Sequence, residues 1–176
     1  MSVLTIVRLQ PSKVQQSRLA FVLLEFIGTM KANLKKFEKL IERLAPAGFK
    51  VSSLAPDTWT KTQASFATAG IVTVWNGASE STLYSKPAVN FAFRAWHDSI
   101  HLKHGNDFSL RGEELTADRQ IEQAWNATTD KSLRQFCQDV LTFEIVEQAR
   151  LAVYTGEFLE NQLASGLQYL AMKGWK

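Results

Sequence analysis

The chain has 176 residues, of which 45% are hydrophobic and 21% charged, and this composition excludes long disordered, collagen-like and charged-tail proteins. The size fits one ordinary domain spanning residues 1–176. Twenty Lys and Arg against 17 Asp and Glu give a net charge of +3, a mild excess that does not support nucleic-acid binding.

No segment of the sequence matches a secretory signal or a membrane span well. Met1–Leu9 is too short and too early charged for a secretory signal. The most apolar run, Leu19–Ile27, is interrupted by Glu25 and falls far short of a membrane span. The single cysteine, Cys137, excludes an internal disulfide and is expected to be a buried structural thiol. We therefore expect a cytoplasmic protein that does not cross a membrane.

Residues 1–48 are predicted to contain a long helix. Met1–Leu9 fits a short strand or an extended lead-in, and Pro11 and Ser12 are typical of a helix entrance. Apolar residues then recur at alternating four- and three-residue steps, so that they form one seam of a helix that Pro46 ends. The lysines lie off this seam, and the seam offers a surface for a homodimer. Its members are Leu23, Ile27, Met30, Leu34, Phe37, Ile41 and Leu44.

Residues 49–86 change character and are rich in Ser and Thr. Ile71–Trp75 is a β-branched run typical of a strand, and Asn76-Gly77 is a turn signal. Thr82–Tyr84 could return as a second strand. The pattern predicts a small β-hairpin or an irregular insertion in the middle of the domain.

Residues 87–176 again predict helices with short connections. Ser109 is expected to cap one helix, Thr129 or Asp130 another, and glycines are expected to end them. The expected spans are about 88–104, 110–125, 131–155 and 158–172. The fold class is therefore mainly α, a helical bundle of four to five helices with the small β insertion.

All three histidines of the chain lie within nine residues. His97, His101 and His104 stand at i, i+4 and i+7, which places them on one face of a helix. Two imidazoles one turn apart can share one metal ion. Three histidines on one face favour a metal or catalytic role over a solvated face or a set of core histidines bonded to carbonyls.

The order His97-Asp98-x-x-His101 resembles the zinc-peptidase signature His-Glu-x-x-His, with aspartate in place of glutamate. The resemblance implies that His97 and His101 bind zinc and that Asp98 is the general base, although aspartate is one methylene shorter. The His-Asp pair is also similar to that of HD-type phosphohydrolases, but those enzymes need a further histidine upstream, and this chain has none before His97.

Carboxylate partners are expected from facing helices. The helix predicted over 131–155 has an inward seam at four- and three-residue steps, and Glu144 and Glu147 occupy two of its positions. Its other members are Leu133, Cys137, Val140, Leu151 and Tyr154. A buried carboxylate is expensive unless it is paired or binds a metal. Gln148 lies beside them. The alternative is a rotated helix in which Ile145, Val146 and Ala149 face inward and both glutamates are solvated.

The helix predicted over 110–125 offers Glu113 and Glu114, which could equally be first-turn residues that complement the helix dipole. The stretch from Pro87 to Asp98, with Asp107–Ser109 and Gly112-Glu113, resembles uncharacterised proteins of tailed phages and mobile elements. That resemblance implies no activity, but it favours Glu113 over Glu114.

Together these residues predict a metal-binding helical protein, which could be a hydrolase that uses a metal-activated water. His97, His101, Glu113 and Glu144 would bind the metal, and Asp98 would be catalytic. Zinc, iron or manganese would suit this donor set, and the substrate would be a small molecule or carry phosphate. The alternative is a non-catalytic phage or mobile-element interaction protein that dimerises through its long N-terminal helix. Further candidates for the site are His104, Glu147, Gln148 and Arg94.

Overall fold

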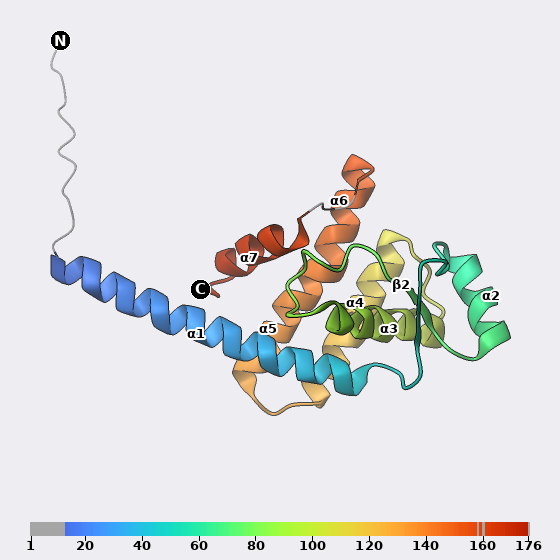
Figure 1. The fold of residues 1–176 in the computed structure, drawn as a ribbon, viewed down its shortest axis with the longest axis horizontal. Helices are drawn as coiled ribbons and strands as arrows, with labels where there is room; N and C mark the ends of the chain where they lie inside the picture. The colour runs from blue at the N-terminus through green and yellow to red at the C-terminus, as the bar shows by residue number, and fades with distance from the viewer. Residues whose placement is uncertain (1–12, 158, 160, 176) are drawn as a thin grey trace, which may run out of the picture.

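The computed structural model describes the backbone of residues 13–157, 159 and 161–175, and the side chains of this part from residue 28 onward. The described chain is mainly α-helical with one small sheet, which confirms the predicted fold class (Figure 1). The lead-in predicted at Met1–Leu9 lies outside the described residues, and so do the side chains of Leu23 and Ile27.

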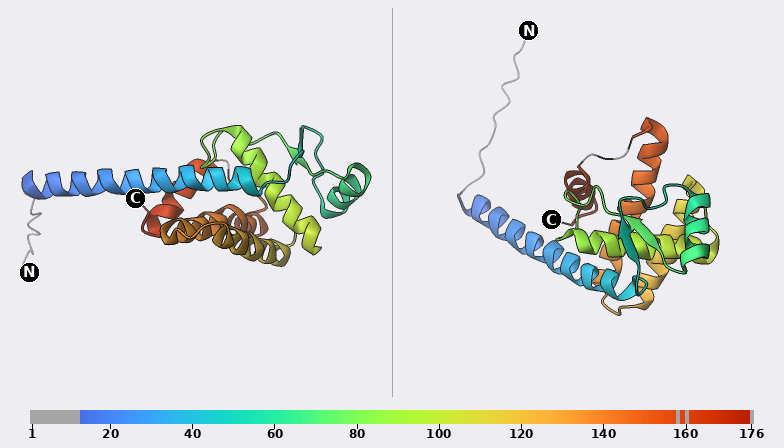
Figure 2. Two further views of the ribbon diagram at one scale, coloured as in Figure 1. Left: turned by 90° about the horizontal axis from the view of Figure 1, so that it is seen from below. Right: turned by 45° about the vertical axis from the view of Figure 1, so that its right-hand side comes forward.

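The long helix α1 (Lys13–Leu44) lies along one side of the protein, and its first half extends beyond the other helices (Figure 2). Phe37 and Ile41 are fully buried, and the Phe37 ring packs edge-on against Phe136. This part of the predicted seam therefore packs into the core of the same chain and does not form a free surface for a second copy. In the part of the chain that the structure describes, no helix has the length and apolar character needed to span a membrane.

The middle segment forms a strand–helix–strand unit instead of a hairpin. β1 (Lys50–Ser52) and β2 (Thr73–Trp75) pair in parallel, and α2 (Trp59–Ala69) connects them. Parallel neighbours need such a crossover, whereas a hairpin would have run antiparallel. The return strand considered at Thr82–Tyr84 is not formed, although these residues are buried. The sequence pattern does not predict α2, because this segment is rich in Thr and Ala and lacks a clear apolar period. Thr58 caps the start of this helix.

The helices α3 (Pro87–His104) and α4 (Leu110–Asn126) form the centre of the fold. α3 packs against α1, α4 and β2, so it is covered on several sides. Trp96 is fully buried, and its indole Nε1 donates a hydrogen bond of 2.8 Å to Gln123 Oε1 on α4. This contact and the apolar core fix the two helices against each other.

The helix predicted over 131–155 is divided into three parts. α5 (Lys131–Leu141) is followed by a π-helical turn, η1 (Thr142–Glu147), and then by α6 (Gln148–Thr155). A π turn adds a residue to one helical turn and so rotates everything that follows. α7 (Gln162–Met172) then packs against α5 and η1.

The turn from α3 to α4 is tight and depends on two glycines. Gly105 ends α3 with a φ of 69°, in the left-handed region that glycine favours. Ser109 caps α4 by accepting a hydrogen bond of 3.1 Å from the Gly112 amide. A Cβ at Gly112 would collide with the backbone oxygen of Asp107, so this glycine lets the turn fold directly onto the first turn of α4.

We therefore expect Gly112→Ala to lower the free energy of unfolding by about 1–3 kcal/mol, because the collision is with backbone and cannot be relieved by a rotamer change. Gly28→Ala is the matched control, since a Cβ there meets nothing within 4 Å. It should be neutral or stabilising by up to about 1 kcal/mol. Urea unfolding of the two variants would measure both effects, and a wild-type curve for Gly112→Ala would contradict this role of the glycine.

Candidate metal centre

Two imidazoles of α3 face each other one helical turn apart. The Nε2 atoms of His97 and His101 are 3.0 Å apart, and the two rings are nearly perpendicular, with an interplanar angle of 81°. His101 is fully buried, whereas His97 keeps a small exposed fraction. The predicted i, i+4 pairing of these histidines is thus observed, and both nitrogens point to one place.

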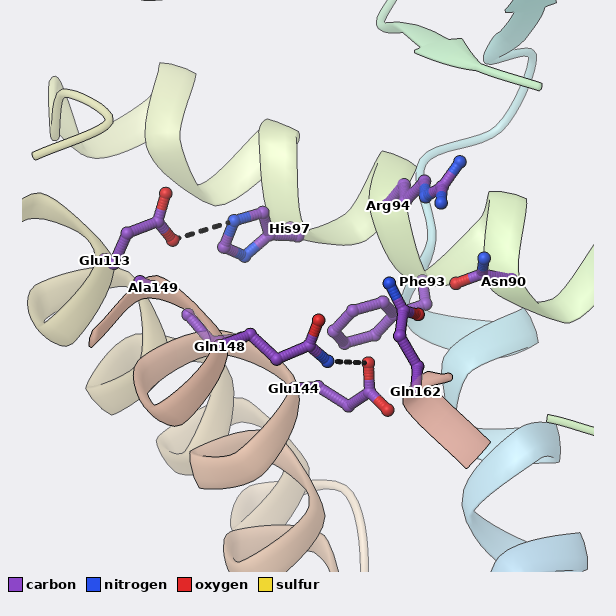
Figure 3. Close-up of a pocket in the computed structure, with 10 residues that line it drawn as sticks. Asn90, Phe93, Arg94, His97, Glu113, Glu144, Gln148, Ala149 and Gln162 are labelled. Atoms are coloured by element: carbon purple, nitrogen blue, oxygen red, sulfur yellow. Dashed lines mark hydrogen bonds and ion pairs between the residues drawn. The ribbon is translucent and has the colours of Figure 1, made fainter. Parts of the chain in front are cut away.

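The third group comes from the first turn of α4. Glu113 Oε2 lies 3.1 Å from His97 Nε2 and 3.4 Å from His101 Nε2. Figure 3 shows Glu113 reaching from its helix toward the His97 ring across the gap between α4 and α3. Two nitrogens and one carboxylate oxygen therefore converge from two helices.

The other ring nitrogens hold the two imidazoles in one tautomer. His101 Nδ1 lies 3.0 Å from the backbone oxygen of Asn106, which can only accept a hydrogen bond. With Nδ1–H as the donor this contact is a hydrogen bond, and Thr116 Oγ1 lies 3.3 Å from the same nitrogen. His97 Nδ1 lies 2.8 Å from Gln120 Oε1, which accepts in the same way. When a neutral imidazole carries its proton on Nδ1, its Nε2 presents a lone pair.

The spacing of the three donor atoms fits one metal ion. Ligand atoms about 2.1 Å from a shared ion stand about 3.0 Å apart at a right angle and about 3.4 Å apart at the tetrahedral angle. The observed separations of 3.0, 3.1 and 3.4 Å lie within this range. Among the residues that the structure describes, His97, His101 and Glu113 form a group that could hold a metal ion.

The same group attracts positive charge electrostatically. Burial acts to lower the pKa of His97, but the Glu113 carboxylate outweighs it and raises that pKa to about 9. Burial acts to raise the pKa of Glu113, but the charge and hydrogen bonds of the histidines lower it to about 2. A proton and a metal ion would thus compete for this place.

Asp98 does not belong to this group, although it follows His97 directly. It is half-buried and lines a cavity of about 450 Å³ together with His97 and Glu113. Burial is the main cause that raises the pKa of Asp98, and the nearby histidines oppose it. No described residue donates a hydrogen bond to its carboxylate, so Asp98 is available to a molecule in the cavity.

Glu144 lies on the wall of a second cavity of about 200 Å³, which His97 and Glu113 also line. Its Oε2 accepts a hydrogen bond of 3.0 Å from Gln148 Nε2 (Figure 3). Glu144 lies in the π turn and Gln148 directly follows it, and Ile145 lines the same cavity. Glu144 is not one of the three converging ligands, so the structure places it beside that group.

The remaining predicted residues have other contacts. His104 is exposed at the end of α3. Glu147 and Glu114 both pair with Arg150, at 3.2 and 3.1 Å. Arg94 donates hydrogen bonds to the backbone oxygens of Trp75, Gly77 and Ala78, and so holds the connection between β2 and α3. Cys137 is buried, as expected.

Three residues of the site had no signal in the sequence. Gln120 and Asn106 accept from the histidines, and Thr116 Oγ1 in turn accepts a hydrogen bond of 2.9 Å from Asn106 Nδ2. Thr116 and Gln120 are fully buried polar residues on α4. They stand one helical turn apart, and Thr116 one turn after Gly112, a spacing that marks one helix face without indicating its chemistry.

Comparison with protein-family models, curated proteins and solved structures found no match for this chain.

The pH dependence of stability is expected to reveal the burial of Glu144. Burial raises the pKa of Glu144 from 4.5 to about 7, against the opposing hydrogen bond from Gln148. A carboxyl whose pKa is raised by folding stabilises the folded state fully below its unfolded pKa, and that contribution is lost as the pH rises through its folded pKa. The loss is roughly 3 kcal/mol.

We therefore expect Glu144→Gln to be more stable than the wild type at about pH 8, by an amount that shrinks toward about pH 5. Urea unfolding of the metal-free proteins at both pH values would measure this. Glu147→Gln is the matched control, because its surface ion pair with Arg150 contributes about 1 kcal/mol at most. A difference in the free energy of unfolding between Glu144→Gln and the wild type that stays constant across this pH range would show that folding does not raise the pKa of Glu144.

Proposed function

We propose that the protein is a metal-dependent hydrolase whose ion is held by His97, His101 and Glu113. The observation that carries this proposal is the hydrogen bonding at Nδ1 of both histidines. It leaves two Nε2 lone pairs and one carboxylate oxygen facing each other at 3.0 to 3.4 Å. With both rings neutral such a cluster is repulsive, and either a proton on His97 or a metal ion at its centre stabilises it.

The donor set favours zinc, because two histidines and one glutamate are a known ligand set of catalytic zinc. Iron and manganese accept the same nitrogen and oxygen ligands. A zinc ion with three protein ligands lowers the pKa of a bound water to about 7, which supplies a nucleophile for hydrolysis. His97 and Glu113 border both cavities, so a substrate in either one would lie beside the ion.

Asp98 is the proposed general base. Asp98 lines the larger cavity together with His97 and Glu113, and no described residue donates a hydrogen bond to its carboxylate. A base must reach the proton that it removes and must have a pKa not far below the working pH. Burial shifts the pKa of Asp98 in that direction. This role agrees with the one that the resemblance to the zinc-peptidase signature implies.

Metal content tests the proposal first. Protein purified without a histidine tag should retain about one ion per chain, and the variant His97→Ala/His101→Ala should lose it, because two of three ligands are gone. Elemental analysis would measure this, and zinc should raise the melting temperature of the wild type but not that of the double variant. His104→Ala is the control and should keep the metal. No bound metal and no response of melting to zinc, manganese or iron would favour a non-catalytic interaction protein.

The partner of His97 Nδ1 offers a second test. Gln120→Leu removes the acceptor that holds the His97 tautomer and should weaken zinc binding about 10- to 100-fold, as a competition titration with a chromogenic chelator would show. Gln135→Leu, at an exposed position on α5 that contacts neither histidine, is the control and should leave zinc affinity unchanged. Equal zinc affinities for Gln120→Leu and the wild type would mean that the tautomer is set in another way.

Hydrolysis is tested by Asp98→Asn, which keeps the shape of the side chain but cannot accept a proton. With p-nitrophenyl acetate or bis(p-nitrophenyl) phosphate as substrate, zinc-loaded wild type should release p-nitrophenol. The variant should lose about 100-fold or more of kcat with its metal content unchanged. Asp118→Asn, an exposed position on α4, is the control. Metal-independent release, or full activity of Asp98→Asn, would contradict the proposed role.

A further inference from the structure

The smaller cavity beside the three ligands contains a buried oxygen without a partner. Glu144 Oε2 accepts from Gln148, but Glu144 Oε1 is buried and no described residue donates to it. Buried carboxylate oxygens normally accept hydrogen bonds, because an unpaired one keeps the cost of leaving water. Figure 3 shows this carboxylate between Gln148 and Gln162 at the edge of the cavity.

The nearest cation does not satisfy this oxygen. Arg94 lines the same cavity, and its charge acts to lower the pKa of Glu144. Its guanidinium nitrogens, however, donate to the backbone oxygens of Trp75, Gly77 and Ala78. Arg94 therefore contributes charge at a distance and no hydrogen bond to Glu144.

Two of the other polar side chains that line the cavity also present acceptors, while Gln162 contributes an amide that can donate or accept. Gln148 uses its amide nitrogen on Glu144, and Asn90 uses its amide nitrogen on Ser79 at 3.0 Å. Each amide thus keeps its oxygen for another partner. Phe93, which also lines this cavity, adds an aromatic ring that can pack against a cation.

We propose that this cavity is the subsite for a cationic nitrogen, an ammonium group, on the substrate that the metal centre cleaves. An ammonium has three donors and no acceptor, which matches Glu144 Oε1 and the two amide oxygens. An anionic group would be repelled by Glu144, and an apolar group would leave the buried oxygen unpaired. This inference rests on the proposed function, because the cleaved bond must reach His97 and Glu113 from the same cavity.

Hydroxamates can test the subsite separately from the metal, because a hydroxamate chelates zinc whatever its other end carries. β-Alanine hydroxamate and γ-aminobutyric hydroxamate end in an ammonium, and propionohydroxamate and butyrohydroxamate are their counterparts without it. Calorimetric titration of the zinc-loaded protein at about pH 8 keeps Glu144 ionised and the amines protonated. At least one amino hydroxamate should bind about tenfold tighter than its counterpart.

The variant Glu144→Gln should lose this preference while its affinity for the two alkyl hydroxamates stays the same. Glu147→Gln, three residues further along the same turn but paired with Arg150, should keep the preference. Equal binding of amino and alkyl hydroxamates by the wild type would overturn the subsite and leave the metal centre intact. If the protein binds zinc but no hydroxamate at all, the proposal that the metal has an open coordination position is wrong as well. If the protein binds no zinc, the proposed function is wrong.

Discussion

The candidate site depends on the hydrogen bonds at the Nδ1 atoms of His97 and His101. Asn106 and Gln120 accept at these atoms, and as a consequence both Nε2 atoms turn their lone pairs to one place. If either ring carries a proton on Nε2, as His97 does when it is protonated, the approach of 3.0 Å between the two Nε2 atoms is an ordinary hydrogen bond and needs no metal ion. The chemistry proposed for the protein therefore follows from two acceptors that never touch the metal.

The fold concentrates this arrangement in one helix–turn–helix segment. His97 and His101 lie near the end of α3, Asn106 lies in the turn, and Glu113 and Gln120 lie on α4. The short turn, with glycines at its two ends, brings the start of α4 back beside the last turns of α3. Burial of Trp96 and its bond to Gln123 hold the helices in register. The helices around them add the walls of two cavities that open to the same ligands, one with Asp98 and one with Glu144.

Sequence patterns could predict the parts of this site that depend on local geometry. A four-residue spacing in a helix settles that His97 and His101 share a face, and caps such as Ser109 set where α4 begins. The acceptors could not be predicted, because a buried Gln120 looks like any polar residue until the opposite helix is placed. The π turn η1 changes which residues of 131–155 face inward, so the seam predicted for one continuous α-helix is wrong after the turn. The predicted seam residues are buried as far as Val140, but Tyr154 is 84% exposed. The predicted hairpin was wrong because β2 pairs with β1, which precedes it by a whole helix, α2. The Thr- and Ala-rich composition of α2 did not indicate a helix.

The most direct measurement is the tautomer of the two histidines, read from long-range ¹H–¹⁵N correlation spectra. In metal-free protein at about pH 10, where His97 is neutral, both rings should carry their proton on Nδ1. Addition of zinc should then move the two Nε2 resonances and leave both Nδ1 atoms protonated. Rings protonated on Nε2, or Nε2 resonances that zinc does not move, would contradict a metal centre formed by these two Nε2 atoms.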